Sequence, residues 1–266
     1  MRAERSSGEA FQEVVCLEYH DVSDQAGPPG GARLYRLASL EFEAHLRSIQ
    51  ERHCHICHLG GGLPEANARP VLLTFDDGFR SALDTIAGVL ERFGWRGHFF
   101  IVTDWIGKAG YLDRSQIREL AGRGHVIGTH SCSHPERMPG LDASRLVREW
   151  SESREVLAEI TRDGVRTGSV PNGYYDRAVA EAAAEAGLET LFTSEPTMAV
   201  RNVNGCLVRG RYTLKRGMKA EVSGAIACGA GWPRARQSIA WGARKVLKGL
   251  LGETYISVRK RILQHY

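Results

Sequence analysis

Two short motifs place side chains that could bind a metal ion and accept a proton. Two adjacent carboxylates, Asp76 and Asp77, follow the apolar run Val71-Leu72-Leu73. Two imidazoles four residues apart, His130 and His134, follow a second apolar run. Two histidines and one aspartate form a three-ligand set for a divalent metal that leaves room for water. Because a second aspartate remains to act as a base, the sequence predicts metal-assisted hydrolysis.

The elements that must position these motifs alternate along the chain. Strands are predicted over residues 14–19, 71–75, 98–102, 125–129, 166–170 and 189–193, with helices between the later ones. Such alternation favours an α/β fold of parallel strands joined by right-handed crossovers. The candidate chemistry then lies at the carboxyl ends of strands, at His20, Asp76, His130 and Pro171–Gly173. A parallel α/β barrel builds its active site at that edge.

Capping residues support this alternation. Ser39, Asp142 and Asp176 are the predicted N-caps of three helices. A further helix is predicted over residues 81–93, closed by Gly94.

Length and composition suit a soluble enzyme. The chain has 266 residues, of which 42% are hydrophobic and 25% charged, enough for one large α/β barrel domain or two small ones. The net charge of +4 is too small to predict nucleic-acid binding, so no nucleic acid is expected as a partner. Six scattered cysteines favour reduced thiols in a cytoplasm. No apolar run follows the polar N-terminus, so we expect no secretory signal and a cytoplasmic location.

The paired motifs resemble a known family. Residues 74–78, read Thr-Phe-Asp-Asp-Gly, and residues 130–134 are similar to the first two motifs of the polysaccharide deacetylases of carbohydrate esterase family 4, the NodB-homology domain. The similarity extends to Tyr19-His20-Asp21-Val22 and to residues 97–102, and covers roughly residues 14 to 200. The resemblance implies a distorted (β/α)7 barrel that removes acetyl groups from N-acetylated sugars.

The resemblance also assigns roles to the motif residues. It implies that Asp76 is the general base and that Asp77, His130 and His134 bind the metal. The metal would polarise the amide carbonyl and lower the pKa of water. Zinc suits this ligand set, and cobalt or nickel would fit a similar geometry.

The third motif of the family, Arg-x-Pro-aromatic-Gly, is only partly present as Ser169-Val170-Pro171-Asn172-Gly173. In the family, the backbone N–H at the aromatic position stabilises the oxyanion, and Asn172 can still supply that N–H. The missing arginine would tether the base. Our hypothesis is that Arg209 or Arg211 replaces it from another strand end.

The last motif, Leu-x-His, whose histidine is the general acid in the family, is absent. His20 is the better candidate for the acid because it follows a predicted strand, and the alternative is that it binds substrate. After His134 the next histidine is His265, the penultimate residue, which has no strand context.

The predicted organisation has three parts. Residues 1–13 form a flexible N-terminal segment, residues 14–228 the barrel, and residues 229–266 a basic amphipathic helical extension. The extension could cover the barrel, or attach peripherally to an anionic membrane on the inner face of the cell membrane.

A histidine and cysteine cluster over residues 53–58 raises the alternative of a second metal site. Its Cys-x-x-Cys spacing has no second pair at zinc-finger spacing, and the segment falls where the resemblance expects an early barrel strand. We therefore favour a strand. Trp105 also follows a predicted strand and could stack on a sugar ring.

Together these features predict a metal-dependent deacetylase acting on an N-acetylated saccharide in a cell-envelope polysaccharide or its lipid-linked precursor. One alternative is a related hydrolase of non-peptide carbon–nitrogen bonds, such as a deformylase. The other is a non-catalytic glycan-binding module with a decayed site.

Overall fold

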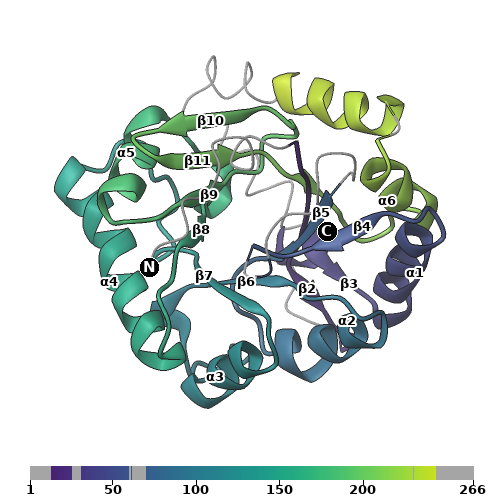
Figure 1. The fold of residues 1–266 in the computed structure, drawn as a ribbon, viewed down its shortest axis with the longest axis horizontal. Helices are drawn as coiled ribbons and strands as arrows, with labels where there is room; N and C mark the ends of the chain where they lie inside the picture. The colour runs from purple at the N-terminus through teal and green to yellow at the C-terminus, as the bar shows by residue number, and fades with distance from the viewer. Residues whose placement is uncertain (1–12, 26–30, 60, 62–69, 230, 244–266) are drawn as a thin grey trace.

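The computed structural model describes residues 13–25, 31–59, 61, 70–229 and 231–243. A curled, mostly parallel sheet occupies its centre and helices surround it (Figure 1). The first strands of this sheet are β1 (Val15–Tyr19), β4 (His55–Cys57), β5 (Pro70–Phe75) and β6 (His98–Ile101). The later ones are β7 (Val126–Thr129), β8 (Thr167–Ser169), β9 (Thr190–Phe192), β10 (Val200–Val203), β11 (Cys206–Arg209) and β12 (Tyr212–Thr213).

The strand order is β10-β11-β9-β8-β7-β6-β5-β1-β12, with β4 also paired to β5. Strand β11 runs parallel to β9, and β12 runs parallel to β1 at the other end of the order. Only Gly210 and Arg211 separate β11 from β12, so this connection closes the curled sheet. A side chain at position 210 would collide with the carbonyl oxygen of Glu195, which explains the glycine. The predicted distorted barrel is confirmed.

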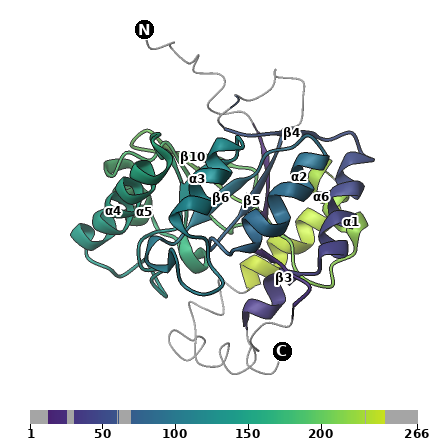
Figure 2. The ribbon, with the colours of Figure 1, turned by 90° about the horizontal axis from the view of Figure 1, so that it is seen from below.

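The outer helices follow the predicted alternation. They are α1 (Ser39–Gln50), α2 (Gly88–Arg92), α3 (Arg114–Gly122), α4 (Ala143–Thr161), α5 (Arg177–Glu185) and α6 (Ala220–Ala227). Figure 2 shows α4 and α5 on one side of the barrel and α1, α2 and α6 on the other. The carboxylates of Asp142 and Asp176 accept hydrogen bonds from the third residue of their helices, so both predicted N-caps are confirmed.

One local prediction was wrong. Ser39 is the first residue of α1 and not its cap, because Ala38 before it has the extended backbone of the N-cap, and the side chain of Asp24 accepts the Ser39 N–H at 2.8 Å. The predicted helix over residues 81–93 is present: it begins as a π-helix, η2 (Ala82–Ala87), and continues as α2, with Gly94 just past its end at a φ of 74°.

Period-two alternation along the strands separates an outer core from the barrel interior. On β1, Val15 and Leu17 join the large core beneath the helices, whereas Cys16 belongs to a small apolar layer inside the barrel with Leu72. Two residues further along each strand, Glu18 and Thr74 are buried polar side chains. The interior is therefore apolar at its amino end and polar at its carboxyl end.

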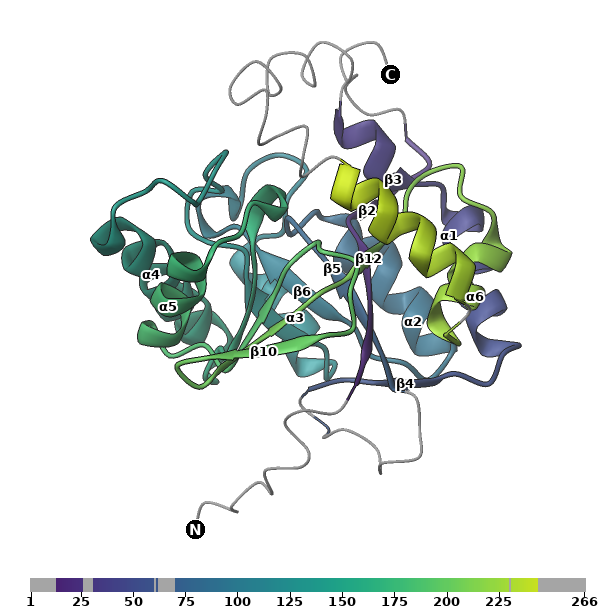
Figure 3. The ribbon, with the colours of Figure 1, turned by 90° about the horizontal axis from the view of Figure 1, so that it is seen from above.

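Other segments complete the described structure. Strands β2 (Asp21–Val22) and β3 (Arg36–Leu37) pair in parallel beside the barrel. The residues 53–58 contain β4, as expected. Residues 231–243 form a helix that lies beside β12 in Figure 3. In the described part of the chain, no helix combines the length and apolarity needed to cross a membrane.

Candidate active site

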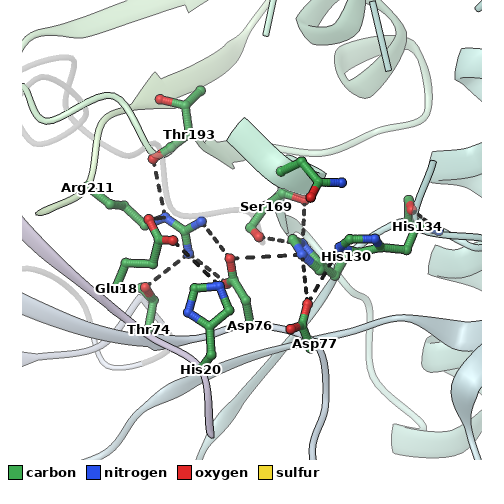
Figure 4. Close-up of polar contacts among 12 residues, drawn as sticks. Glu18, His20, Thr74, Asp76, Asp77, His130, His134, Ser169, Thr193 and Arg211 are labelled. Atoms are coloured by element: carbon green, nitrogen blue, oxygen red, sulfur yellow. Dashed lines mark hydrogen bonds and ion pairs between the residues drawn. The ribbon is translucent and has the colours of Figure 1, made fainter. Parts of the chain in front are cut away.

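The carboxyl ends of β5 and β7 bring the two predicted motifs together. Asp77 Oδ1 lies 3.4 Å from His130 Nε2 and 3.6 Å from His134 Nε2. Figure 4 shows the three side chains converging, with Asp76 beside them. Asp76 Oδ2 is 3.9 Å from His130 Nε2. The structure thus gathers the four residues that the sequence singled out.

The tautomer of His130 follows from its contacts with β8. Its Nδ1 lies 2.9 Å from the carbonyl oxygen of Ser169 and 2.6 Å from the Ser169 hydroxyl. A carbonyl oxygen only accepts, so Nδ1 carries the proton and donates it. The lone pair of His130 is therefore on Nε2, the atom that faces Asp77. This is the arrangement in which a histidine binds a metal while its other nitrogen is held by a hydrogen bond.

Helix α4 fixes the loop that carries the histidines. The buried carboxylate of Glu149 accepts hydrogen bonds from the backbone N–H groups of Cys132 and Ser133 and from the Ser133 hydroxyl. The Ser131 hydroxyl accepts a hydrogen bond from the His134 N–H at 3.0 Å. The loop between the histidines is therefore held by side chains and not only by the ends of β7.

Unusual backbone conformations concentrate around the site. Seven non-glycine residues have a positive φ in the described ranges. Four of these lie in the site loops: Asp77 (75°), Ser131 (68°), His134 (54°) and Asn172 (56°). Left-handed backbone is costly for most residues and persists only where the surroundings hold it, so these loops are shaped for the side chains they present.

Arg211 is the tether of Asp76. Its two terminal nitrogens donate to the two carboxylate oxygens of Asp76, each at 2.7 Å. Arg211 is fully buried and Asp76 is 3% exposed. Of the two arginines in our hypothesis, Arg211 thus makes the contact. Arg209 is also buried, close to Cys16 at the amino end of the interior.

The same guanidinium is held by three further groups. It donates to the Thr193 carbonyl at 3.2 Å and to the Thr74 hydroxyl at 3.1 Å. Its Nε lies 3.6 Å from a carboxylate oxygen of Glu18. Figure 4 shows Arg211 between Glu18 and Asp76. Burial opposes the charge on Arg211, yet the two carboxylates raise its pKa above the ordinary value.

Asp76 is therefore ionised. Burial by itself would raise the pKa of Asp76, but Arg211 and the neighbouring His130 hold the pKa well below its usual range. Burial by itself would raise the pKa of Asp77 too, but the proximity of His130, His20 and His134 lowers it. Burial, together with the proximity of His130, lowers the pKa of His134 to about 4, so His134 is neutral at physiological pH.

His20 also reaches the site from the end of β1. Its ring lies over Tyr35, with centroids 4.6 Å apart, and its Nε2 is 3.8 Å from Glu18. Its Nδ1 is buried and has no hydrogen-bond partner among the described residues. A buried nitrogen without a partner is costly unless something else binds it, which makes it a candidate contact for a substrate.

The donor set of Asp77, His130 and His134 fits a divalent metal. Their ligand atoms all lie within 4.8 Å of one another. In a tetrahedral zinc site with bonds of about 2.0–2.1 Å, ligand atoms are about 3.4 Å apart, close to the two measured separations from Asp77. A second group, Glu18, His20 and Asp76, is equally close, but the guanidinium of Arg211 already supplies its positive charge.

The altered third motif lies next to the histidines. Pro171–Gly173 forms a short 3-10 turn after β8. The side chain of Asn172 donates to the Pro135 carbonyl at 3.4 Å, which places this turn beside the His134 loop. The ring of Trp105 packs at a tilt against that of His134, with centroids 4.9 Å apart, so Trp105 supports one of the candidate metal ligands.

A family comparison agrees with this geometry. Residues 64–191 match the family model for polysaccharide deacetylase. These residues form a polysaccharide deacetylase domain. Members of this family are hydrolases of carbon–nitrogen bonds other than peptide bonds.

Individual polysaccharide deacetylases extend the match. YxkH of Bacillus subtilis (strain 168), which bears the name of a polysaccharide deacetylase, is 26% identical over 215 residues, 79% of this chain and 74% of YxkH. The peptidoglycan-N-acetylmuramic acid deacetylase PdaA of the same organism is 25% identical over 135 residues, 50% of this chain and 49% of PdaA. The Streptococcus pyogenes deacetylase PplD, solved in complex with acetate, has a TM-score of 0.68 at 17% identity, over 79% of this chain and 96% of that chain. The last likeness shows the fold.

Sequence reasoning missed the roles of two residues of this candidate site. Glu18 contacts both His20 and Arg211, and Ser169 holds His130 at the position where the family motif has arginine. Glu18 could have been found from the period-two alternation of side chains along a strand, because it lies on β1 two residues before His20, which follows the strand. Ser169 gave no such signal, since its contact depends on the pairing of β7 with β8.

Proposed function

We propose that the protein is a zinc-dependent deacetylase that hydrolyses the acetamide of an N-acetylated sugar in a cell-envelope polysaccharide or its lipid-linked precursor. The observation that carries this proposal is an ionised aspartate, Asp76, held by Arg211 beside a three-ligand metal set. The name of PdaA, a peptidoglycan-N-acetylmuramic acid deacetylase, supports a cell-envelope sugar as the substrate class.

Asp77, His130 and His134 would hold the metal. When bound, the metal would supply a Lewis acid that polarises the acetamide carbonyl and acidifies a water molecule. Asp76 accepts the proton that this water loses as its oxygen attacks the carbonyl carbon. Arg211 keeps Asp76 unprotonated and in one orientation before each turnover.

Two further groups complete the reaction. The backbone N–H of Asn172 donates to the carbonyl oxygen as it becomes an oxyanion. His20 donates a proton to the amine nitrogen as the carbon–nitrogen bond breaks, and the carboxylate of Glu18 lies 3.8 Å from its Nε2. The products are acetate and a free amino sugar, so atoms and charge balance.

The test combines metal analysis with a measurement of acetate release from a panel of three saccharides. The panel contains β-1,4-linked and β-1,6-linked N-acetylglucosamine tetramers and the N-acetylglucosamine–N-acetylmuramic acid disaccharide. We expect about one zinc per chain and acetate release that falls about 10²- to 10⁴-fold in Asp76→Asn. That variant should keep its metal, whereas Asp77→Asn should lose it.

Three outcomes would contradict parts of the proposal. Release of formate from N-formyl sugars, without acetate release, would favour a deformylase. Bound metal with no hydrolysis of any amide would favour a glycan-binding module. A His20→Ala variant that retains the alkaline limb of the pH–rate profile would exclude His20 as the acid.

A further inference from the structure

The helix over residues 231–243 is anchored to the barrel near its closure. Arg234 donates to the Ile226 carbonyl at 2.8 Å and lies over the ring of Tyr212 at 5.4 Å. Gln237 donates to the Thr213 carbonyl at 3.1 Å, and the Ser238 hydroxyl donates to the Pro196 carbonyl at 2.7 Å. These contacts fix the helix against β12 and the segment after β9, as Figure 3 shows for β12. It lies outside the residues 64–191 that match the family.

This anchoring brings Trp241 to the 3-10 turn Pro171–Gly173, which we call the third-motif turn. A Cβ atom on Gly173 would lie 3.1 Å from Cη2 of Trp241 and 3.1 Å from Cβ of Ser194. The absence of a side chain at Gly173, which has a φ of 64°, therefore lets the tip of the indole approach the backbone. Trp241 is only partly buried, so part of the residue is open to solvent.

A series of contacts then links Trp241 to the candidate metal ligands. Gly173 follows Asn172, whose backbone N–H we assign to the oxyanion. The side chain of Asn172 reaches the Pro135 carbonyl at 3.4 Å, and Pro135 follows His134. The indole therefore borders the place where the acetamide carbonyl must lie if the proposed function is correct.

We propose that Trp241 is a substrate-contacting residue whose indole packs against the apolar face of a sugar ring of the N-acetylated saccharide. This inference rests on the proposed function. Tryptophan offers a large, rigid, amphipathic surface, with little conformational entropy to lose on binding. Trp241 lies on a helix, and the hydrogen bonds of Gln237 and Ser238 fix that helix against the barrel. A carbohydrate contact thus comes from beyond the family match.

The same helix supplies a matched control. Trp232 is 73% exposed and lies on the side of the helix that faces solvent. Replacing Trp232 changes tryptophan content and helix composition as much as replacing Trp241 does, but leaves the third-motif turn untouched. Trp241→Phe provides a second comparison, because it keeps an aromatic ring and most of the packing.

The experiment measures kcat and KM with the first saccharide of the three-member panel from which the wild-type protein releases acetate. We expect Trp241→Ala to raise KM about 5- to 30-fold with kcat changed less than about threefold, which is the magnitude of one lost stacking contact. Trp241→Phe should raise KM less, and Trp232→Ala should leave both constants unchanged.

Binding without turnover separates this inference from the proposed function. In the Asp76→Asn background, titration of the same saccharide should show the same loss of affinity for Trp241→Ala. An unchanged KM or affinity, or a fall in kcat and thermal stability alone, would overturn the inference and leave the deacetylase intact. If the wild-type protein releases acetate from no member of the panel, the proposed function fails first and the inference fails with it.

Discussion

Arg211 faces two buried carboxylates, and this sets the electrostatics of the site. Its guanidinium contacts Asp76 with two hydrogen bonds and lies near Glu18, and all three side chains are almost completely buried. Removing one member of such a group leaves an uncompensated charge in the interior, which costs far more than the net contribution of the intact group.

We therefore expect Arg211→Gln to lower the free energy of unfolding by about 3–5 kcal/mol at pH 7. In the wild type the pKa of Asp76 is lowered, so its stabilising contribution is present at neutral pH and is lost as the pH falls below the ordinary carboxylate pKa. In the variant, burial without Arg211 raises that pKa, and protonation then relieves the penalty. The difference between variant and wild type should shrink from pH 7 to pH 4 in urea unfolding.

The control for this prediction is Arg177→Gln. Arg177 forms an ion pair with Glu181 on α5, but its side chain is 78% exposed. An exposed ion pair is screened by solvent and contributes little, so this variant should unfold almost as the wild type does. A loss for Arg211→Gln no larger than that of Arg177→Gln would refute the role assigned to Arg211.

The residues that sequence reasoning identified share a local signature. Asp76, Asp77, His130 and His134 could be predicted because their types and spacing are read directly along the chain. The sequence could not show which of Arg209 and Arg211 contacts Asp76, because the two lie two residues apart in one segment and both are buried. What distinguishes them is the end of the interior each one reaches, and that depends on how β11 passes into β12 at the closure of the sheet.

At the scale of elements, the short turn after β8 has Asn172 where the family motif has an aromatic residue, and its backbone conformation can still present the N–H. Asn172 has φ 56° and ψ 6°, a left-handed conformation that asparagine and glycine tolerate better than β-branched residues. Its proposed contribution to catalysis is a backbone N–H, so the conformation matters more than the side chain.

We expect Asn172→Gly to keep acetate release within about threefold of the wild type. Asn172→Val should reduce release about 10- to 100-fold, because strain of about 1–2 kcal/mol at this residue displaces the N–H that stabilises the oxyanion. Steady-state kinetics at saturating saccharide measure both. Equal activity of the two variants would show that the conformation of this turn does not control the reaction.

Strand β6 carries a buried histidine whose neutral form is built into the barrel. His98 Nδ1–H donates to the Leu73 carbonyl at 3.2 Å, and Nε2 accepts the Leu59 N–H at 3.1 Å. Burial lowers the pKa of His98 to about 4. Protonation would add a charge and remove the acceptor that holds Leu59.

This histidine should make stability fall with acidification. Its folded pKa is below the unfolded value of about 6.5, so its contribution is complete above pH 6.5 and is lost as the pH falls towards 4. The loss is on the order of 3 kcal/mol across that window. Urea unfolding of His98→Gln should show a smaller decline, whereas the exposed His55→Gln control should decline as the wild type does. Parallel declines in all three proteins would contradict the prediction.

The elements that could be predicted from hydrophobic periodicity and capping residues are those with strong local sequence signals. The buried strands β1, β5, β6 and β7 read as apolar runs, and α4 and α5 have aspartate caps. The β10–β11 hairpin and β12 were not predicted. β12 has only two residues. β10 has exposed polar residues at Arg201 and Asn202, so its pairing is set by neighbouring strands and not by its own sequence.

At the scale of the whole molecule, the helix over residues 231–243 limits which C-terminal residues can be removed without disturbing the barrel. The boundary predicted at residue 229 stays a prediction, but this helix packs on the barrel through Arg234, Gln237 and Ser238. Deleting residues 233–266 would therefore disturb the barrel as well as any membrane contact. The remaining residues, 244–266, lie outside the described ranges.

We propose that the basic residues beyond position 243 attach the protein to an anionic membrane, with a cytoplasmic location at its inner face. The residues are Arg244, Lys245, Lys248, Arg259, Lys260 and Arg261. Replacing all six with glutamine should abolish co-sedimentation with phosphatidylserine vesicles, because each cation near the surface contributes about 1 kcal/mol. Acetate release from a soluble saccharide should not change, since the helix over residues 231–243 is intact. Replacing the exposed Arg145, Arg148 and Arg177 should leave vesicle binding as in the wild type, and sedimentation of the six-residue variant at wild-type levels would exclude this attachment.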